Sequence, residues 1–102
     1  MRLVSLKVLK DFCSRRPDAS GSVRQWAQRI DSITPGNFSE LRSFFGSVDY
    51  VSPFTVFNLG GNKFRLIATV HYASGAVFIR WMLTHGEYDK WTRRYLQGKI
   101  KK

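Results

Sequence analysis

Three runs rich in β-branched and aromatic residues, separated by two short turns, constrain the fold of this chain more than any other feature. The runs span Phe54–Leu59, Lys63–Tyr72 and Ala76–Leu83, and the turns contain Gly60-Gly61 and Ser74-Gly75. Runs of this length with turns this short predict an antiparallel meander. The segment from Ser47 to Tyr50, closed by Ser52-Pro53, is a candidate edge strand.

Strand alternation divides the second hairpin into two faces if Ser74-Gly75 is a two-residue turn and Ala73 pairs with Ala76. One face is then almost purely apolar and comprises Phe64, Leu66, Ala68, Val70, Tyr72, Val77, Ile79, Trp81 and Leu83. We expect this face to pack against helices. The other face receives Lys63, Arg65, Ile67, Thr69, His71, Phe78, Arg80 and Met82, and the same alternation across the first turn adds Asn58.

Helical periodicity precedes the strands. A short strand over Leu3–Leu6 is expected first, and then apolar residues repeat at helical spacing until Arg15-Arg16-Pro17 ends the helix. A second helix is indicated by Val23, Trp26, Ala27, Ile30 and Ile33, and Ser22 with Gln25 has the form of a capping box. A third, short helix is expected over residues 38–45, opening at Asn37 or Ser39.

After the strands, Thr84-His85-Gly86-Glu87 has the form of another capping box. The helix that it opens carries Tyr88, Trp91 and Tyr95 on one side, and Gly98 is a natural stop. The sequence therefore predicts one α+β domain over residues 1–102. In this domain the N-terminal helices pack on a small antiparallel β-sheet, and a C-terminal helix follows.

The charge balance indicates a polyanionic partner. The chain has 17 Lys and Arg against 7 Asp and Glu, a formal net charge of +10. Nucleic acid is the commonest partner of so basic a domain, although an acidic protein or an anionic membrane surface is also compatible. The single cysteine, Cys13, allows no internal disulfide, and its place on an apolar stripe indicates a buried structural thiol. No apolar stretch is long enough to cross a bilayer and no secretory signal is evident, so we expect a cytoplasmic protein.

The polar face of the sheet brings together the residue types that RNA cleavage requires. Arg65 and Arg80 are expected on neighbouring strands with Lys63 toward one end, and His85 and Tyr88 begin the following helix. Attack of a ribose 2′-hydroxyl on the adjacent phosphate needs a base, an acid and cations that hold the growing negative charge. No cluster of residues has metal-ligand spacing, so this chemistry is expected without a metal or other cofactor.

Structural interpretations of the same residues stay open from the pattern alone. A polar face with Arg and Lys is what any antiparallel sheet presents to water. His85 is equally an ordinary helix N-terminal residue, and Glu87 is better explained as the cap partner than as a catalyst. The stripe of Tyr88, Trp91 and Tyr95 favours packing over base stacking.

Several segments resemble the HigB-type toxins, which belong to the RelE superfamily of bacterial messenger-RNA interferases. They are Leu6–Phe12, Pro17–Ala19, Val56–Leu66, Phe78–Arg80 and Thr84–Lys90. The resemblance implies N-terminal helices on a small sheet and metal-free cleavage of mRNA on the translating ribosome. It also implies a helix-turn-helix antitoxin of the HigA type as the partner.

On this basis we assign catalysis to Arg65, Arg80, His85 and Tyr88, and RNA contacts to Lys63, Asn58 and Lys90. The predicted function is a ribosome-associated endoribonuclease that is the toxin of a toxin–antitoxin pair. One alternative is a non-catalytic RNA- or ribosome-binding module that uses the same charge. Another is a protein-interaction module whose basic face docks an acidic antitoxin segment.

Overall fold

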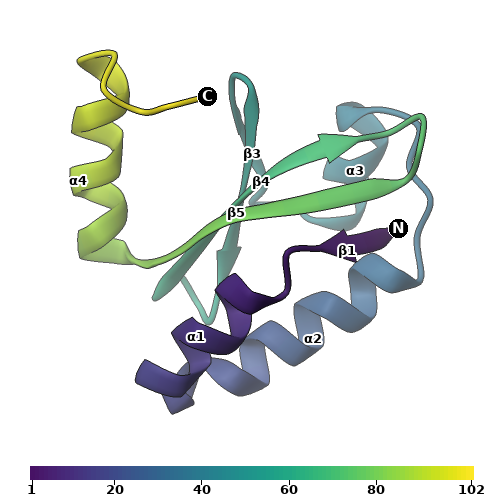
Figure 1. Ribbon diagram of the computed structural model, residues 1–102. Coiled ribbons are helices and arrows are strands. Elements are labelled where there is room, and N and C mark those ends of the chain that lie inside the picture. Colours follow the sequence, from purple (N-terminus) through teal and green to yellow (C-terminus); the bar gives the residue numbers. More distant parts are fainter.

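A computed structural model describes residues 1–102 and shows helices on both sides of one five-stranded sheet (Figure 1). Its elements are β1 (Arg2–Val4), α1 (Lys7–Arg15), a 3₁₀ turn (Pro17–Ala19), α2 (Ser20–Asp31), α3 (Phe38–Phe44), β2 (Asp49–Val51), β3 (Phe54–Leu59), β4 (Phe64–His71), β5 (Ala76–Thr84) and α4 (His85–Leu96). The predicted α+β class and order of elements are confirmed. No helix has the length and apolar character needed to span a bilayer.

The sheet has the strand order β1-β5-β4-β3-β2. Strands β2 to β5 form the predicted antiparallel meander, whereas β1 lies parallel to β5 and makes the sheet mixed. The predicted antiparallel meander is therefore extended by one parallel edge strand, whose pairing the sequence did not predict. The long connection through α1, α2 and α3 separates β1 from the meander, and a connection of this length permits parallel pairing.

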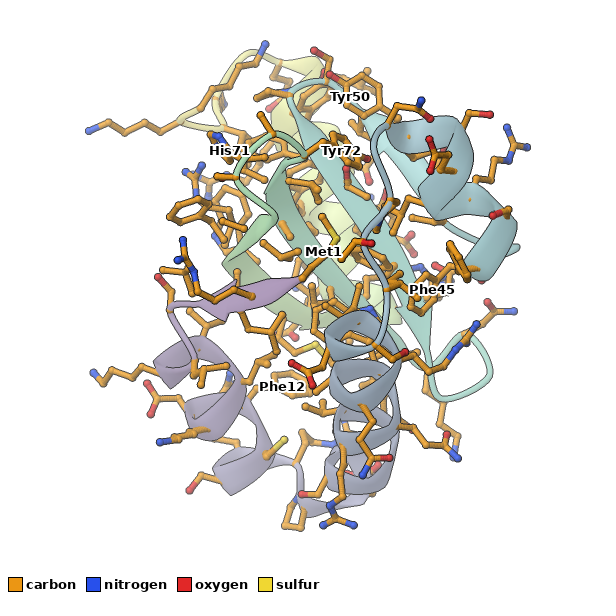
Figure 2. The ribbon with its side chains drawn as sticks, turned by 90° about the vertical axis from the view of Figure 1, so that its right-hand side faces the viewer. Met1, Phe12, Phe45, Tyr50, His71 and Tyr72 are labelled. Atoms are coloured by element: carbon orange, nitrogen blue, oxygen red, sulfur yellow. The ribbon has the colours of Figure 1, made fainter.

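The main core lies between the sheet and the N-terminal helices. It includes Leu9 and Phe12 of α1, Trp26 and Ile30 of α2, and the inward side chains of β3, β4 and β5. Figure 2 labels Phe12 between the ribbons of α1 and α2, and its ring meets that of Phe64 edge-on at 5.6 Å. Cys13 packs against this core as a partly buried free thiol. Burial of this apolar face stabilises the predicted layer of helices on the sheet.

A smaller cluster on the opposite side of the sheet holds α4 in place. It consists of Phe54, Val56, Ile67 and Trp91, with Trp81, Leu83, Tyr88, Tyr95 and Ile100 packed against it. The Trp91 ring stacks between Tyr88 and Tyr95, with ring centroids 5.8 Å and 5.5 Å apart. The aromatic stripe of α4 is therefore a packing surface, as its helical spacing favoured.

A β-bulge reverses the predicted facing of the last residues of β5. His71 pairs with Ala76, so the turn is longer than predicted, and Ala73 does not pair with Ala76. Ala68 then pairs with Ile79, but Ile67 pairs with Trp81, which leaves Arg80 as an extra residue. Beyond this bulge Met82 faces the N-terminal helices, while Trp81 and Leu83 face α4. The predicted positions of these three residues were wrong.

The two predicted capping boxes had different outcomes. Thr84 caps α4: its side chain accepts from the Glu87 N–H, and the Glu87 carboxylate accepts from the Thr84 N–H. Ser22 does not cap α2, because the 3₁₀ turn over Pro17–Ala19 leads directly into a helix that begins at Ser20. Asn37 caps α3, as one of the two predicted openings proposed.

Candidate functional site

Arg65, His85 and Tyr88 meet where β4 begins and α4 leaves the sheet. Arg65 lies on the second residue of β4, between Asn58 of β3 and Leu83 of β5. The backbone N–H of His85 donates to the Lys63 carbonyl at 3.0 Å, which fixes the first residue of α4 beside the start of β4. The Thr84 cap orients the same turn, so a backbone contact and a capping box together position His85 and Tyr88.

The Arg65 guanidinium is buried without a carboxylate partner. Arg65 is 8% exposed, and none of the ion pairs of the chain includes it. Its Nη1 donates to the carbonyls of Asn62 and Phe64, and its Nη2 donates to Nδ1 of His85 at 3.1 Å. These bonds use three of the five N–H groups of a guanidinium, which leaves two for another acceptor. A buried cation without a counterion is costly, so this site favours an anion.

The contact with Arg65 defines the hydrogen-bonding state of His85. A guanidinium only donates, so Nδ1 of His85 is the acceptor and the proton of the neutral ring is on Nε2. Nε2 lies 3.9 Å from a carboxylate oxygen of Asp89, and both side chains are exposed. The ring is thus held between a cation on one nitrogen and a carboxylate near the other.

Tyr88 completes the group on the buried side. The guanidinium carbon of Arg65 lies 5.6 Å from the centre of its ring. Burial raises the pKa of the Tyr88 phenol above its usual value, with a smaller upward contribution from Asp49, while Thr92 and Arg65 act in the opposite direction. The phenol therefore keeps its proton at neutral pH, where it can donate hydrogen bonds or a proton.

A hollow of about 380 Å³ opens beside this group. Its lining includes Arg65, Tyr88 and Asn58, and also Ser47 and Asp49 from the segment before β3. A volume of this size is within the range of small-ligand sites, roughly 300–1,000 Å³. Asn58 is therefore where the sequence predicted it, on the face that carries Arg65.

Asp49 lines this hollow and was missed by the sequence reasoning. Pairing with Val56 places Asp49 on the α4 side of the sheet, where its charge acts on Tyr88. The sequence gives no signal for this position, because β2 is three residues long and the turn before β3 is not a short glycine turn. The register of β2 alone decides which of its side chains reaches the site.

Three predicted residues lie outside this group. Arg80 donates to the backbone carbonyls of Lys101 and Lys102, and its guanidinium lies over the rings of Phe54 and Trp81. The structure places it on the predicted face but does not bring it to Arg65, His85 or Tyr88, so the predicted convergence of three cations is incorrect.

Lys63 and Lys90 do not join the group through their side chains. Lys63 is exposed, and it contributes to lowering the pKa of Asp18 after the larger effect of the Arg16 hydrogen bond. Lys90 lines a separate hollow between α4, β5 and the C-terminal residues, together with Trp81 and Ile100. The group that the structure assembles is therefore Arg65, His85, Tyr88, Asn58 and Asp49.

Comparisons with known proteins identify the family of this chain. The profile of the HigB toxin family, described as the RelE-like toxic component of a toxin–antitoxin system, matches residues 19–91. The chain is 34% identical over 98 residues to the mRNA interferase toxin HigB of Escherichia coli K12, covering 90% of this chain and 91% of that protein. The mRNA interferase HigB of Shigella flexneri gives the same values. That of E. coli O6:H1 is 29% identical over 97% of this chain and 99% of its own length. The chain belongs to the HigB toxin family, the RelE-like toxic component of toxin–antitoxin systems.

Proposed function

We propose that this protein is an endoribonuclease that cuts mRNA on the translating ribosome, by attack of a ribose 2′-hydroxyl and without a metal ion. The observation that carries the proposal is the buried Arg65 guanidinium, which lacks a carboxylate and touches both His85 and Tyr88. Such a cation suits a phosphate, because a planar guanidinium donates to two phosphate oxygens at once. The relatives named above are mRNA interferases, which makes mRNA the substrate of choice.

Binding of the scissile phosphate is proposed to activate His85. The phosphate is charged and accepts more strongly than a neutral imidazole, so it draws Arg65 away from Nδ1 of His85. The freed Nδ1 then accepts the proton of the 2′-hydroxyl as the new bond from its oxygen to phosphorus forms. Binding of the substrate therefore also frees His85 to act as the general base.

Tyr88 is proposed as the acid. The bond between phosphorus and the 5′-oxygen breaks, and the Tyr88 phenol donates its proton to that oxygen. The products are a 2′,3′-cyclic phosphate and a free 5′-hydroxyl. The raised pKa of Tyr88 keeps this proton in place before the reaction, and Arg65 holds the charge that grows on the phosphate. Every proton and charge is assigned to a side chain, and the chain has no group of three His, Cys, Asp or Glu residues that could hold a metal.

Other positions are proposed to bind RNA around this centre. Asn58 lies in the same hollow and can hydrogen-bond a base or a ribose. Phosphates farther along the RNA strand are proposed to contact Arg80, Lys63 and Lys90. In the cytoplasm, a helix-turn-helix antitoxin of the HigA type is the proposed partner that keeps the toxin inactive.

Primer extension on a defined mRNA in a cell-free translation reaction tests the proposal. Purified protein is added with and without initiating ribosomes, and cuts are expected only on translated RNA. Intact RNA from folded protein in every condition would reject cleavage, and RNA binding without cuts would favour the non-catalytic binding module.

A further inference from the structure

A second, smaller hollow lies next to the site and is lined mostly by polar groups. It has a volume of about 120 Å³ and lies between α2, the end of α3 and the last residues of β3. Its lining residues are Ser22, Gln25, Trp26, Arg29, Phe45, Asn58, Leu59 and Gly60. None of them is acidic, and the volume admits a phosphate group but not a whole nucleotide. Figure 2 labels Phe45, which marks its α3 side.

The lining of this hollow combines a buried tryptophan, Trp26, with one cation, Arg29. The indole Nε1–H of Trp26 is buried and has no hydrogen-bond partner, although the residue is only 4% exposed. Arg29 is held beside it, because its guanidinium lies 4.3 Å from the centre of the Phe45 ring and donates to the Phe44 carbonyl. Trp26 thus forms part of the wall of the hollow, and Arg29 supplies the positive charge that suits a phosphate.

The backbone keeps this hollow open at Gly60. Its φ is +62°, and a Cβ at this position would lie 3.2 Å from Oγ of Ser22 and 3.0 Å from the Phe64 ring. The strand beside it also ends early, since β2 pairs only with Phe54–Val56 of β3. Both features leave space beside the end of β3.

Asn58 lines this hollow and also the larger one that contains Arg65 and Tyr88. A chain of nucleotides with its scissile phosphate on Arg65 can therefore pass Asn58 and place another phosphate beside Arg29. We propose that the hollow between α2 and β3 is a second phosphate-binding subsite for the RNA backbone, formed by Arg29, Gln25 and Ser22, with the Trp26 ring in its wall. The inference rests on the proposed function, because it concerns the same RNA.

Gln25→Glu tests the subsite with little effect on folding, since Gln25 is exposed on α2. The new carboxylate would repel a phosphate in the hollow. Gln28→Glu is the matched control: it makes the same charge change on the same helix, but Gln28 lies in a different hollow, with Met1 and Asp31.

The probes are a hexanucleotide and a dinucleotide RNA with 2′-O-methyl groups at every position, so that neither can be cleaved. Binding is followed by NMR titration of the full-length protein. Gln25→Glu is expected to weaken hexanucleotide binding about tenfold, equivalent to about 1.4 kcal/mol. The dinucleotide has one phosphate and cannot fill both hollows, so its affinity is expected to stay unchanged. Gln28→Glu is expected to bind both probes as the wild type does.

The wild-type protein supplies a second measurement through the Trp26 indole N–H resonance. It is expected to shift on addition of the hexanucleotide and not of the dinucleotide. The proposal is overturned if this resonance does not move at hexanucleotide saturation, or if Gln25→Glu binds the hexanucleotide as the wild type does. Equal weakening by the two Glu variants would also overturn it, since overall charge would then explain the loss. None of these outcomes depends on cleavage, so failure of the wild type to cut mRNA rejects the proposed function separately.

Discussion

Replacement of Arg65 by Met should abolish most of the activity and leave the protein folded. The variant removes the guanidinium that faces His85 and Tyr88, and Met fills much of the same buried volume without a charge. Loss of one donor that stabilises transition-state charge lowers rates by about 10²–10³, or roughly 2.7–4 kcal/mol. We expect a reduction of that size in the rate of mRNA cleavage.

The stability of the same variant should change little, because two terms oppose each other. The three hydrogen bonds of Arg65 are made by a charged group, at about 1.5 kcal/mol net for each at the lower end. Burial of a guanidinium without a carboxylate costs several kcal/mol. Because these two terms nearly cancel, the free energy of unfolding of Arg65→Met should differ from that of the wild type by no more than about 2 kcal/mol.

Single-turnover cleavage in the translation reaction and urea unfolding measure the two quantities on one protein preparation. Arg24→Met is the control, since Arg24 is exposed on α2 and loses the same charge far from the site. Arg65→Lys should recover only part of the rate, because an ammonium lacks the planar fork. Arg65→Met cleaving within about threefold of the wild type would refute the reasoning. A second result would also refute it: a fall of more than about 4 kcal/mol in the free energy of unfolding of Arg65→Met, with Arg65→Lys restoring both stability and cleavage rate. Arg65 would then have a structural role.

Three further outcomes follow from the contacts described. Arg80→Ala should slow cleavage about tenfold in the same assay, less than Arg65→Met, because Arg80 does not contact His85 or Tyr88. A loss as large as that of Arg65→Met would place Arg80 at the reacting phosphate. Thr84→Ala should lower the free energy of unfolding in urea by about 1 kcal/mol through loss of the α4 cap, and no change would mean that the box with Glu87 is not maintained in solution. Burial raises the pKa of Tyr72 and of Tyr88, so the folded state holds these protons when the unfolded chain has released them. The free energy of unfolding should consequently fall as the pH rises through about 10. The fall should be less steep in a variant with both tyrosines replaced by Phe. Equal pH dependence of the two proteins would contradict the raised pKa of these phenols.

Local sequence signals predicted most of the fold because each acted over a few residues. The run Phe54–Leu59 is β3 as predicted, and β4 and β5 differ from their predicted ends by one residue at each altered end. The Thr84 cap was predictable because both of its hydrogen bonds are made with Glu87, three residues farther along the chain. The Ser22 cap failed for the opposite reason: the turn that begins at Pro17 starts the helix earlier, and a helix start farther upstream removes the need for a cap at Ser22.

The site could be predicted as far as strand parity held. Arg65 pairs with Asn58 in the regular part of the β3–β4 hairpin, and His85 and Tyr88 follow from the end of β5 and the helix cap. Asp49 could not be predicted, because its place depends on how β2 pairs with β3 through tertiary packing. Parity is a local rule, and it says nothing of which register a short strand adopts.

The bulge at Arg80 has a consequence for how RNA must lie on the protein. It directs Arg80 and Trp81 to the same side of the sheet, and it places Arg80 against the last residues of the chain rather than against Arg65. Arg65 pairs with Leu83, three residues beyond Arg80, a separation of about 10 Å along a strand at about 3.3 Å per residue. In the structure the two guanidinium groups also have different partners: Arg65 donates to His85, and Arg80 donates to the carbonyls of Lys101 and Lys102. If both arginines act on RNA, they therefore bind different phosphates of one strand, and the catalytic phosphate belongs to the one that also touches His85 and Tyr88.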